Sequence, residues 1–279
     1  MLRRDERQHR RYLRAARRAF AQVTFYREQC AAAGQLLDEP APTAVAQLPD
    51  PPHTLCPFSR PWVAEREPSL WTPPAHPLAR ALRTAGCRDG DPVLEIRAAL
   101  LDRTRLPRLR RFGPRPPYRV LLSPEAVVAS ETRRAALNRE ALAVVEAAGA
   151  GTVVGGPDEL DAVPGAADPR LRPVRRLPVA AAAEGAEGAE GAERGAGGPA
   201  VLFEPRLGYL GGWMPECGLP HLDTPRVYAR DRDGVVAFSL PRSRRPTLLD
   251  IVPAGAEAVT VGDCPRHGTP VLLARAADG

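Results

Sequence analysis

The sequence contains no lysine, so all 39 of its basic residues are arginines. This absence excludes mechanisms that need a lysine side chain, among them Schiff-base chemistry and nucleotide hydrolysis at a phosphate loop. Aromatic residues are scarce as well, at 5% of the chain. Few side chains are therefore left on which the bases of single-stranded nucleic acid could stack.

Long hydrophobic runs are also missing. No apolar run approaches the roughly 20 residues that a membrane helix needs. The N-terminus carries charge where a signal peptide would have its apolar stretch, so we expect a cytoplasmic protein with no membrane partner. Cysteine is rare and odd in number, which argues against a disulfide framework in a chain of 279 residues. The five cysteines are Cys30, Cys56, Cys87, Cys217 and Cys264.

The formal net charge is +6, and it is unevenly distributed. Residues 1–120 hold 22 arginines against 12 acidic residues, whereas residues 121–279 hold 17 against 21. The enrichment in alanine, proline, glycine and arginine indicates GC-rich codons, which weakens a functional interpretation of this charge. We therefore expect no nucleic-acid partner, and an arginine-rich nucleic-acid-binding protein stays open as an alternative.

Composition and hydrophobic periodicity divide the chain into five segments. They predict an N-terminal helix (1–35), a proline-rich extended segment (36–77), an α/β region (78–179), a flexible low-complexity linker (180–198) and a β-rich region (199–279). Within the first segment, residues 10–33 read as one amphipathic helix that Gly34 ends.

The α/β region alternates strands with helices, which predicts a mainly parallel sheet covered on both faces. Its expected strands are 92–96, 118–122 and 152–154, and its expected helices are 77–85, 133–148 and 157–162. The expected strands of the β-rich region are 201–203, 226–230, 235–240, 258–261 and 271–274. The Asp-Gly turn at 233–234 predicts a hairpin over 227–238.

Familiar catalytic motifs are not found. The glycines at Gly149 and Gly151 follow a helix and precede a strand, the reverse of the order that aims amides at a pyrophosphate, so we interpret them as a helix cap. A nucleophile elbow, a His-Glu-x-x-His helix and a paired-carboxylate motif are absent from the sequence.

The most concentrated signal is a pair of Cys/His motifs. Cys217 precedes His221 by four residues, and Cys264 precedes His267 by three. Two thiolates and two imidazoles would complete a tetrahedral zinc shell if the chain brought the pairs together. The alternative is that these are turn residues, with a buried thiol and exposed imidazoles.

A wider set of motifs then points to a family. The N-terminal matches are Ala19-Phe20, Phe25-Tyr26-Arg27-Glu28, Ala32-Ala33-Gly34 and Leu48-Pro49. The C-terminal matches, in order, are Glu216-Cys217, Leu219, His221, the hairpin, Arg245-Pro246-Thr247-Leu248-Leu249, Asp263-Cys264-Pro265 and Gly268-Thr269-Pro270. In these the chain resembles the adenylate-forming ligases of the phenylacetate-CoA ligase type.

The resemblance implies an α/β fold: a partial adenylate-forming-enzyme core with a parallel sheet and a β-rich C-terminal part. Some members of the family hold zinc with these Cys and His positions. The resemblance therefore implies a zinc site at Cys217, His221, Cys264 and His267, with His267 in place of the family's second clustered cysteine.

The catalytic parts of the family are not matched. The position of the magnesium-binding carboxylate falls on Leu207, that of the ribose-binding aspartate falls near Ala256, and no Ser/Thr/Gly-rich phosphate loop or lysine is found. The chain ends soon after Cys264, where the lid subdomain of the family would begin, so we expect that subdomain to be absent. Loss of each such group costs about a hundredfold to a thousandfold in rate, so we expect no ATP or magnesium cofactor and assign no catalytic residue.

These observations lead to one hypothesis and two alternatives. The hypothesis is a catalytically degenerate ligase-like protein that acts as a binding or accessory protein in biosynthesis of a secondary metabolite, beside an intact ligase, a carrier protein or a small carboxylic acid. The first alternative is an active carboxylate-adenylating ligase that a partner completes. The second is the arginine-rich nucleic-acid-binding protein.

Overall fold

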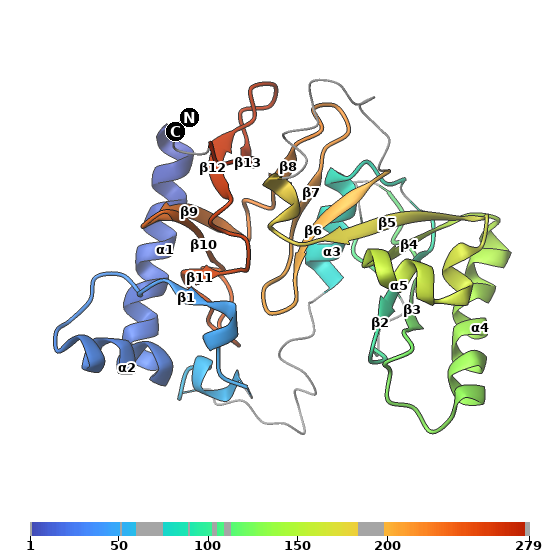
Figure 1. Cartoon of the computed structure of the whole chain (residues 1–279), viewed down its shortest axis with the longest axis horizontal. Coiled ribbons are helices and arrows are strands. Elements are labelled where there is room, and N and C mark those ends of the chain that lie inside the picture. Colours follow the sequence, from blue (N-terminus) through green and yellow to red (C-terminus); the bar gives the residue numbers. More distant parts are fainter. Residues whose placement is uncertain are drawn as a thin grey trace.

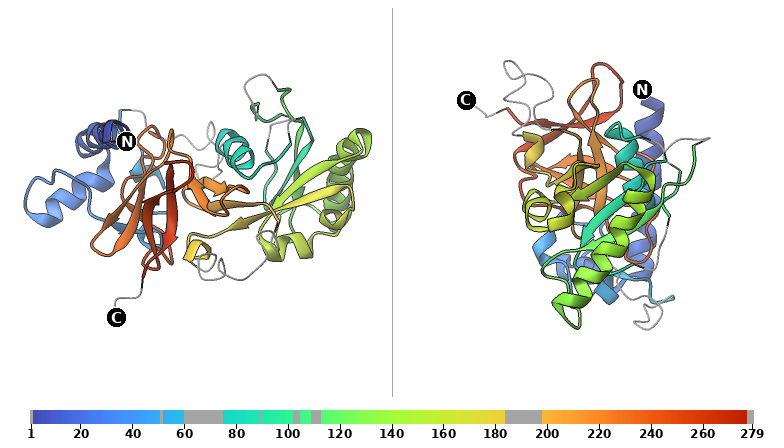
Figure 2. Two further views of the ribbon diagram at one scale, coloured as in Figure 1. Left: turned by 90° about the horizontal axis from the view of Figure 1, so that it is seen from above. Right: turned by 90° about the vertical axis from the view of Figure 1, so that its right-hand side faces the viewer.

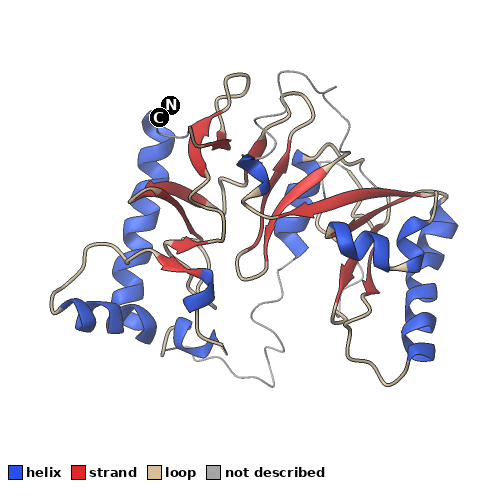
Figure 3. Ribbon diagram, in the orientation of Figure 1, coloured by secondary structure: helices blue, strands red, loops and turns tan. Residues whose placement is uncertain are grey.

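The computed structural model describes residues 2–50, 52–59, 75–88, 90–101, 105–108, 113–183 and 198–276. These residues form a mixed α/β structure with one large and one small sheet (Figures 1 and 3). The predicted α/β class is confirmed in this broad form. Within the ranges given, no helix combines the length and the apolar character needed to span a bilayer.

The large sheet has nine strands in the order β12-β13-β8-β7-β6-β5-β4-β2-β3. Neighbouring strands from β3 to β6 pair in parallel, and those from β6 to β12 pair antiparallel. The sheet is therefore mixed, since the expected parallel strands form only one half of it. The strands are β2 (Val93–Arg97), β3 (Tyr118–Leu122), β4 (Gly151–Gly155), β5 (Leu171–Leu177), β6 (Ala200–Glu204), β7 (Gly208–Trp213), β8 (Pro220–Leu222), β12 (Val259–Asp263) and β13 (Pro270–Ala274).

Helices lie on both faces of the large sheet, as the alternation of strands and helices predicted (Figure 2). Helix α3 (Ala75–Thr84) packs on β7 and β6, whereas α4 (Glu131–Ala148) and α5 (Pro157–Ala162) pack on β3, β4 and β5. Side chains that alternate along β2 enter the two cores in turn, Val93 beneath α3 and Leu94 beneath α4. Each core thus lies between one face of the sheet and the helix that packs on it.

The small sheet packs with the N-terminal helices. Its strands, in spatial order, are β1 (Thr43–Ala44), β11 (Ile251–Val252), β10 (Val235–Ser239) and β9 (Tyr228–Arg232). The predicted hairpin is confirmed, because β9 and β10 pair antiparallel around Asp233 and Gly234. One apolar core joins α1 (Leu2–Gln22) to this sheet and extends from Tyr12 to Leu272. The first and last thirds of the chain therefore share a core.

The expectation of one helix over residues 10–33 was wrong. The chain forms α1 and a second helix, α2 (Thr24–Ala33), separated at Val23, whose backbone is extended. Val23 forms a β-bridge with Pro57, and the amide of Phe58 donates to the carbonyl of Gln22 at 2.9 Å. The proline-rich segment thus competes for the backbone groups that a continuous helix would use. Gly34 ends α2 in the left-handed region, as expected.

Three strands of the large sheet, β5, β7 and β8, were not predicted. The sequence of β7 is rich in glycine, which normally weakens a strand. Here a Cβ on Gly211 would lie 1.9 Å from the carbonyl oxygen of His221, and one on Gly212 would lie 2.8 Å from that of Ala81. The glycines therefore let β8 and α3 approach the backbone of β7.

The expected linker 180–198 is described only in part. Residues 181–183 form a helical turn, and Ala182 is buried in the core that contains α1. Ordered structure thus extends into the start of this segment. Residues 184–197 lie outside the described residues. Short 3-10 helices complete the fold at Val45–Gln47, Pro52–Leu55 and Pro164–Ala167.

A buried carboxylate, that of Asp250, fastens α1 to the small sheet. Its Oδ2 accepts hydrogen bonds from the hydroxyl of Tyr12 at 2.6 Å and from the guanidinium of Arg230 at 2.7 Å. Its Oδ1 accepts one from the hydroxyl of Ser239 at 3.2 Å. Burial and the Asp250 carboxylate both raise the pKa of Tyr12, so the phenol stays protonated and can donate.

Candidate metal centre

Two hairpin loops with the same backbone conformation build the centre. In the β7–β8 loop the amide of Gly218 donates to the carbonyl of Met214 at 2.8 Å. In the β12–β13 loop the amide of Gly268 donates to the carbonyl of Cys264 at 2.7 Å. The two glycines have φ values of 69° and 57°, a left-handed conformation that glycine adopts without steric cost.

The loops also match residue by residue. Segments 214–220 and 264–270 read Met-Pro-Glu-Cys-Gly-Leu-Pro and Cys-Pro-Arg-His-Gly-Thr-Pro. In this match Cys217 is equivalent to His267, and Met214 is equivalent to Cys264. The first loop thus has a thioether where the second has a thiol.

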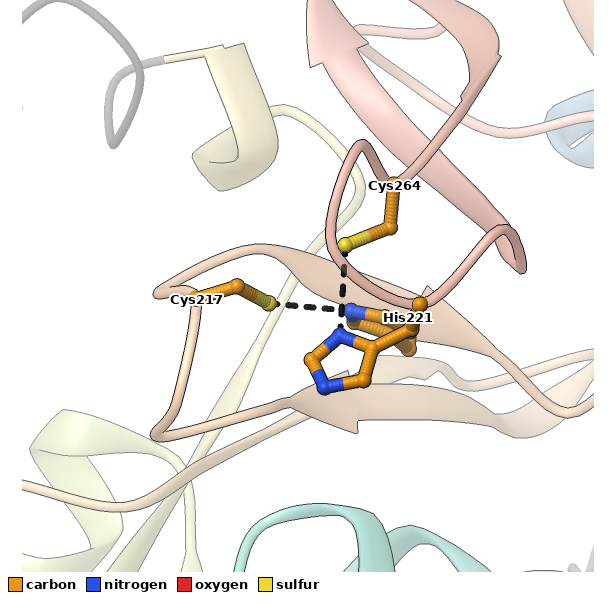
Figure 4. A group of neighbouring side chains, drawn as sticks. Cys217, His221 and Cys264 are labelled. Atoms are coloured by element: carbon orange, nitrogen blue, oxygen red, sulfur yellow. Dashed lines mark hydrogen bonds between the residues drawn. The ribbon is translucent and has the colours of Figure 1, made fainter.

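Strand pairing brings the two loops together. Strand β8 lies beside β13, with His221 opposite Val271. The four predicted ligand atoms, from Cys217, His221, Cys264 and His267, all lie within 4.8 Å of one another. In Figure 4 the side chains of Cys217, His221 and Cys264 point toward one another from the two hairpins. The structure thus assembles a group that could hold a metal ion.

The distances within the group are short. The Sγ of Cys217 lies 3.0 Å from Nε2 of His221, and the Sγ of Cys264 lies 3.3 Å from Nδ1 of His267. Cys264 and His221 are 1% and 4% exposed, whereas His267 is exposed. The alternative of a buried thiol with exposed imidazoles therefore does not describe His221.

Electrostatics in the metal-free group favour the neutral forms of Cys217 and His221. Burial raises the pKa of the Cys217 thiol, and the neighbouring Cys264 raises it further, while the amide of Leu219 opposes the shift. Burial lowers the pKa of His221, and the positive charge of His267 acts in the same direction. A bound cation would favour the thiolates, so metal binding would release protons.

The second nitrogen of His221 is held from outside the group. Its Nδ1 lies 2.7 Å from Oγ1 of Thr269, in the β12–β13 loop. If Nε2 binds a metal, Nδ1 carries the ring proton and can donate it to this hydroxyl. Such a contact orients the imidazole toward the two sulfurs.

We expect Thr269→Val to weaken metal binding while the fold is retained. The change removes the hydroxyl that orients His221 but keeps the β-branched shape at the end of the loop. Loss of an outer partner of this kind costs about 10–100-fold in metal affinity. Titration with Co²⁺, followed by its absorption, measures this loss, and Thr260→Val on β12 is the matched control. Equal affinity of the two variants would contradict the role of Thr269.

Other positions singled out in the sequence have structural roles. Gly149 ends α4 in the left-handed region and its amide donates to the carbonyl of Val145 at 2.8 Å, which confirms the helix cap. Leu207 and Ala256 are 2% and 0% exposed and belong to the core that contains α1. The carboxylate of Glu204 accepts hydrogen bonds from the amide of Leu207 and from the amide that precedes it.

Some residues with structural roles were not predicted from the sequence. The role of Thr269 could have been found from the loop match, since the repeated Pro-x-(Cys/His)-Gly-x-Pro pattern places it next to the ligands. The buried Glu95, which accepts a hydrogen bond from Tyr209 at 2.6 Å and pairs with Arg97 at 2.9 Å, gave no signal. Tyr209 lies on β7, 114 positions along the chain, so the sequence does not reveal this contact.

Comparison of the chain with models of known protein families and with curated proteins finds no match.

Proposed function

We propose that this protein is a zinc-stabilised, catalytically degenerate relative of the adenylate-forming ligases that acts as a binding or accessory protein. The observation that carries the proposal is the convergence of two thiols and two imidazoles from two separate hairpins within 4.8 Å. The family relationship itself rests on the sequence motifs described above.

Zinc is the metal that best suits this set of donors. Closed sites with four ligands from cysteine and histidine are typical of structural zinc, whereas magnesium and calcium prefer oxygen ligands. All four positions would be filled by the protein, so no open position would remain for a reacting water. The metal would therefore stabilise the fold rather than act on a substrate.

The zinc would fasten the β12–β13 hairpin to the β7–β8 hairpin. The register between β8 and β13 consists of the single pair His221 and Val271, so backbone pairing alone joins the hairpins weakly. Structural zinc sites contribute folding free energy, on the order of 10 kcal/mol in small zinc-binding peptides. A metal bound between the two hairpins would compensate for the weak backbone pairing of β8 with β13.

The absence of adenylation chemistry is supported by two buried side chains. At the positions where the resemblance would require a magnesium-binding carboxylate and a ribose-binding aspartate, Leu207 and Ala256 pack into the core. Neither position could take a carboxylate without burying an unpaired charge. The proposed role is therefore binding rather than catalysis. The protein would act beside an intact ligase or a carrier protein, or would bind a small carboxylic acid.

Two measurements on the full chain test the proposal. Protein purified without chelator is expected to hold about one zinc per chain by elemental analysis, and Cys217→Ser is expected to lose the metal and to melt at a lower temperature. Cys30→Ser, on α2 and outside both loops, is the matched control. Well-folded protein without zinc would overturn the metal assignment.

The second measurement addresses catalysis. The zinc-loaded protein is expected to give no exchange of pyrophosphate into ATP with a panel of aryl and alkyl carboxylic acids, and ATP with magnesium is expected to leave the melting temperature unchanged. Acid-dependent exchange would instead support the active-ligase alternative, and Arg206 would be the first residue to replace.

A further inference from the structure

A cluster of exposed arginines lies on α1, outside the metal centre. Helix α1 lies on the left-hand side of the molecule in Figure 1, beside the small sheet. Apart from Glu6, every exposed residue between positions 6 and 17 is an arginine. The arginines line an open hollow of about 520 Å³ together with Leu13. They are Arg7, Arg10, Arg11, Arg14 and Arg17.

The loop between β10 and β11 adds further positive charge beside this helix. Arg242 and Arg244 are exposed in this loop. The guanidinium of Arg18 donates to the carbonyl of Pro241 at 3.3 Å, and Arg11 and Arg242 line the same small hollow. We call the five helix residues together with Arg242 and Arg244 the arginine surface. It joins two segments that are more than 220 positions apart.

Little of this charge is neutralised within the described residues. Arg10 forms an ion pair with Glu6 at 3.0 Å, whereas Arg7, Arg11 and Arg17 pair with no acidic side chain that the structure describes. Burial lowers the pKa of Arg18, and the charge of Arg244 lowers it further. The fold thus holds like charges together at a cost in stability, which points to an external anion as their partner.

The character of the surface discriminates among anionic partners. Protein interfaces have a central region depleted of charge and enriched in aromatic anchors, but the exposed residues here are all charged. Insertion into a lipid surface needs a free apolar face, whereas the apolar face of α1 is in the core, with Tyr12 and Ala16 fully buried. A row of arginines with no exposed aromatic residue matches a repeating phosphate backbone without unpaired bases.

We infer that the arginine surface binds the phosphate backbone of double-stranded nucleic acid, without sequence specificity. This differs from the expectation drawn from composition, because the sequence shows the number of arginines but not the approach of the 242–244 loop to α1. The inference does not rest on the metal centre or on the proposed function.

The test compares two triple variants of the full chain. Arg7→Gln/Arg14→Gln/Arg17→Gln removes three charges from the arginine surface. Glutamine is a good helix former, so α1 should be retained. Arg133→Gln/Arg139→Gln/Arg172→Gln removes three exposed charges from α4 and β5, at the far end of the molecule (Figure 1). The two variants have the same net charge, so a difference in their DNA binding reflects the position of the removed arginines. Melting temperatures establish that both are folded.

Binding to a labelled 20-base-pair DNA duplex is measured by fluorescence anisotropy as a function of salt. We expect the slope of log affinity against log salt to fall in magnitude by about 3 in the α1 variant, since each phosphate contact contributes about 0.9. The control variant should keep the wild-type slope, and Arg244→Gln alone should lower it by about 1.

Three outcomes would overturn the inference. The first is equal slopes for the two triple variants, and the second is no duplex binding by the wild type at 50 mM salt. The third is tighter binding to poly-glutamate or to phosphatidylserine vesicles than to the duplex, which would assign the surface to an acidic protein or to a membrane instead.

Discussion

Replacing Asp250 with alanine is expected to lower the free energy of unfolding by about 3–5 kcal/mol. The side chain is fully buried and accepts hydrogen bonds from Tyr12, Arg230 and Ser239. Without the carboxylate, the Arg230 guanidinium, whose side chain is 16% exposed, would lose its buried partner. Removal of one member of a buried ion pair leaves the other charge less well compensated, here by Glu39 alone at 2.9 Å, and the buried hydrogen-bond donors of Tyr12 and Ser239 also lose their acceptor.

The backbone conformation at position 250 also contributes to the change in the free energy of unfolding. The experiment must separate this contribution from the loss of the carboxylate. Asp250 has a φ of 52°, in the left-handed region, where alanine costs roughly 1–2 kcal/mol and glycine little. Asp250→Gly therefore reports loss of the carboxylate, and the difference between the glycine and alanine variants reports the backbone. Urea unfolding measures both. A loss below about 1 kcal/mol in Asp250→Gly would contradict the role given to this carboxylate.

The second large effect concerns the equivalence of the two hairpin loops. His221→Ala is expected to abolish stoichiometric zinc binding, with a loss of affinity well beyond the roughly 10–100-fold that an outer partner contributes. Adding Met214→Cys in the same chain is expected to restore binding. Cys264, the residue equivalent to Met214 in the other loop, supplies one of the sulfurs of the group, so a thiol at 214 should reach the same point.

The matched control for this rescue is His221→Ala/Met214→Ser, which introduces a side chain of similar size without a thiol. Zinc is measured by elemental analysis after dialysis, and Co²⁺ absorption reports the number of bound thiolates, which should rise from two in the wild type to three in the rescued chain. Rescue by serine as well as by cysteine would show that the two loops are not equivalent in ligation.

Much of the fold could be predicted because the relevant signals are local. The strands at 93–97 and 118–122 are short apolar runs, the helix at 131–148 has a serine cap and a glycine stop, and the β9–β10 hairpin has an Asp-Gly turn. Each signal lies within the element that it specifies. The structure confirms all four elements.

The missed strands depend on neighbours that the local sequence does not reveal. Strand β5 contains a proline and three arginines, and the guanidinium of one of them, Arg176, lies over the ring of Phe203 on β6 at 5.0 Å. Strand β7 needs glycine because of the approach of α3 and β8. In both strands tertiary contacts override weak intrinsic preference.

The metal-binding group could be predicted as a set of residues but not as a geometry. The Cys and His spacing identified the four side chains, and the structure brings them within 4.8 Å. The pairing of β8 with β13, which places the loops side by side, joins positions 50 residues apart. The contact of Thr269 with His221 depends on the same pairing.

The shared core of the first and last thirds has a consequence for synthesis of the chain on the ribosome. Tyr12 meets its partner Asp250 only after 238 further residues have been added. At about 5–20 residues per second, this takes roughly 10–50 s. During that interval the apolar face of α1 has no completed core to enter, and we expect the arginines on its other face to help keep the emerging helix in solution. The same charges would thus serve the nascent chain before they serve the folded protein.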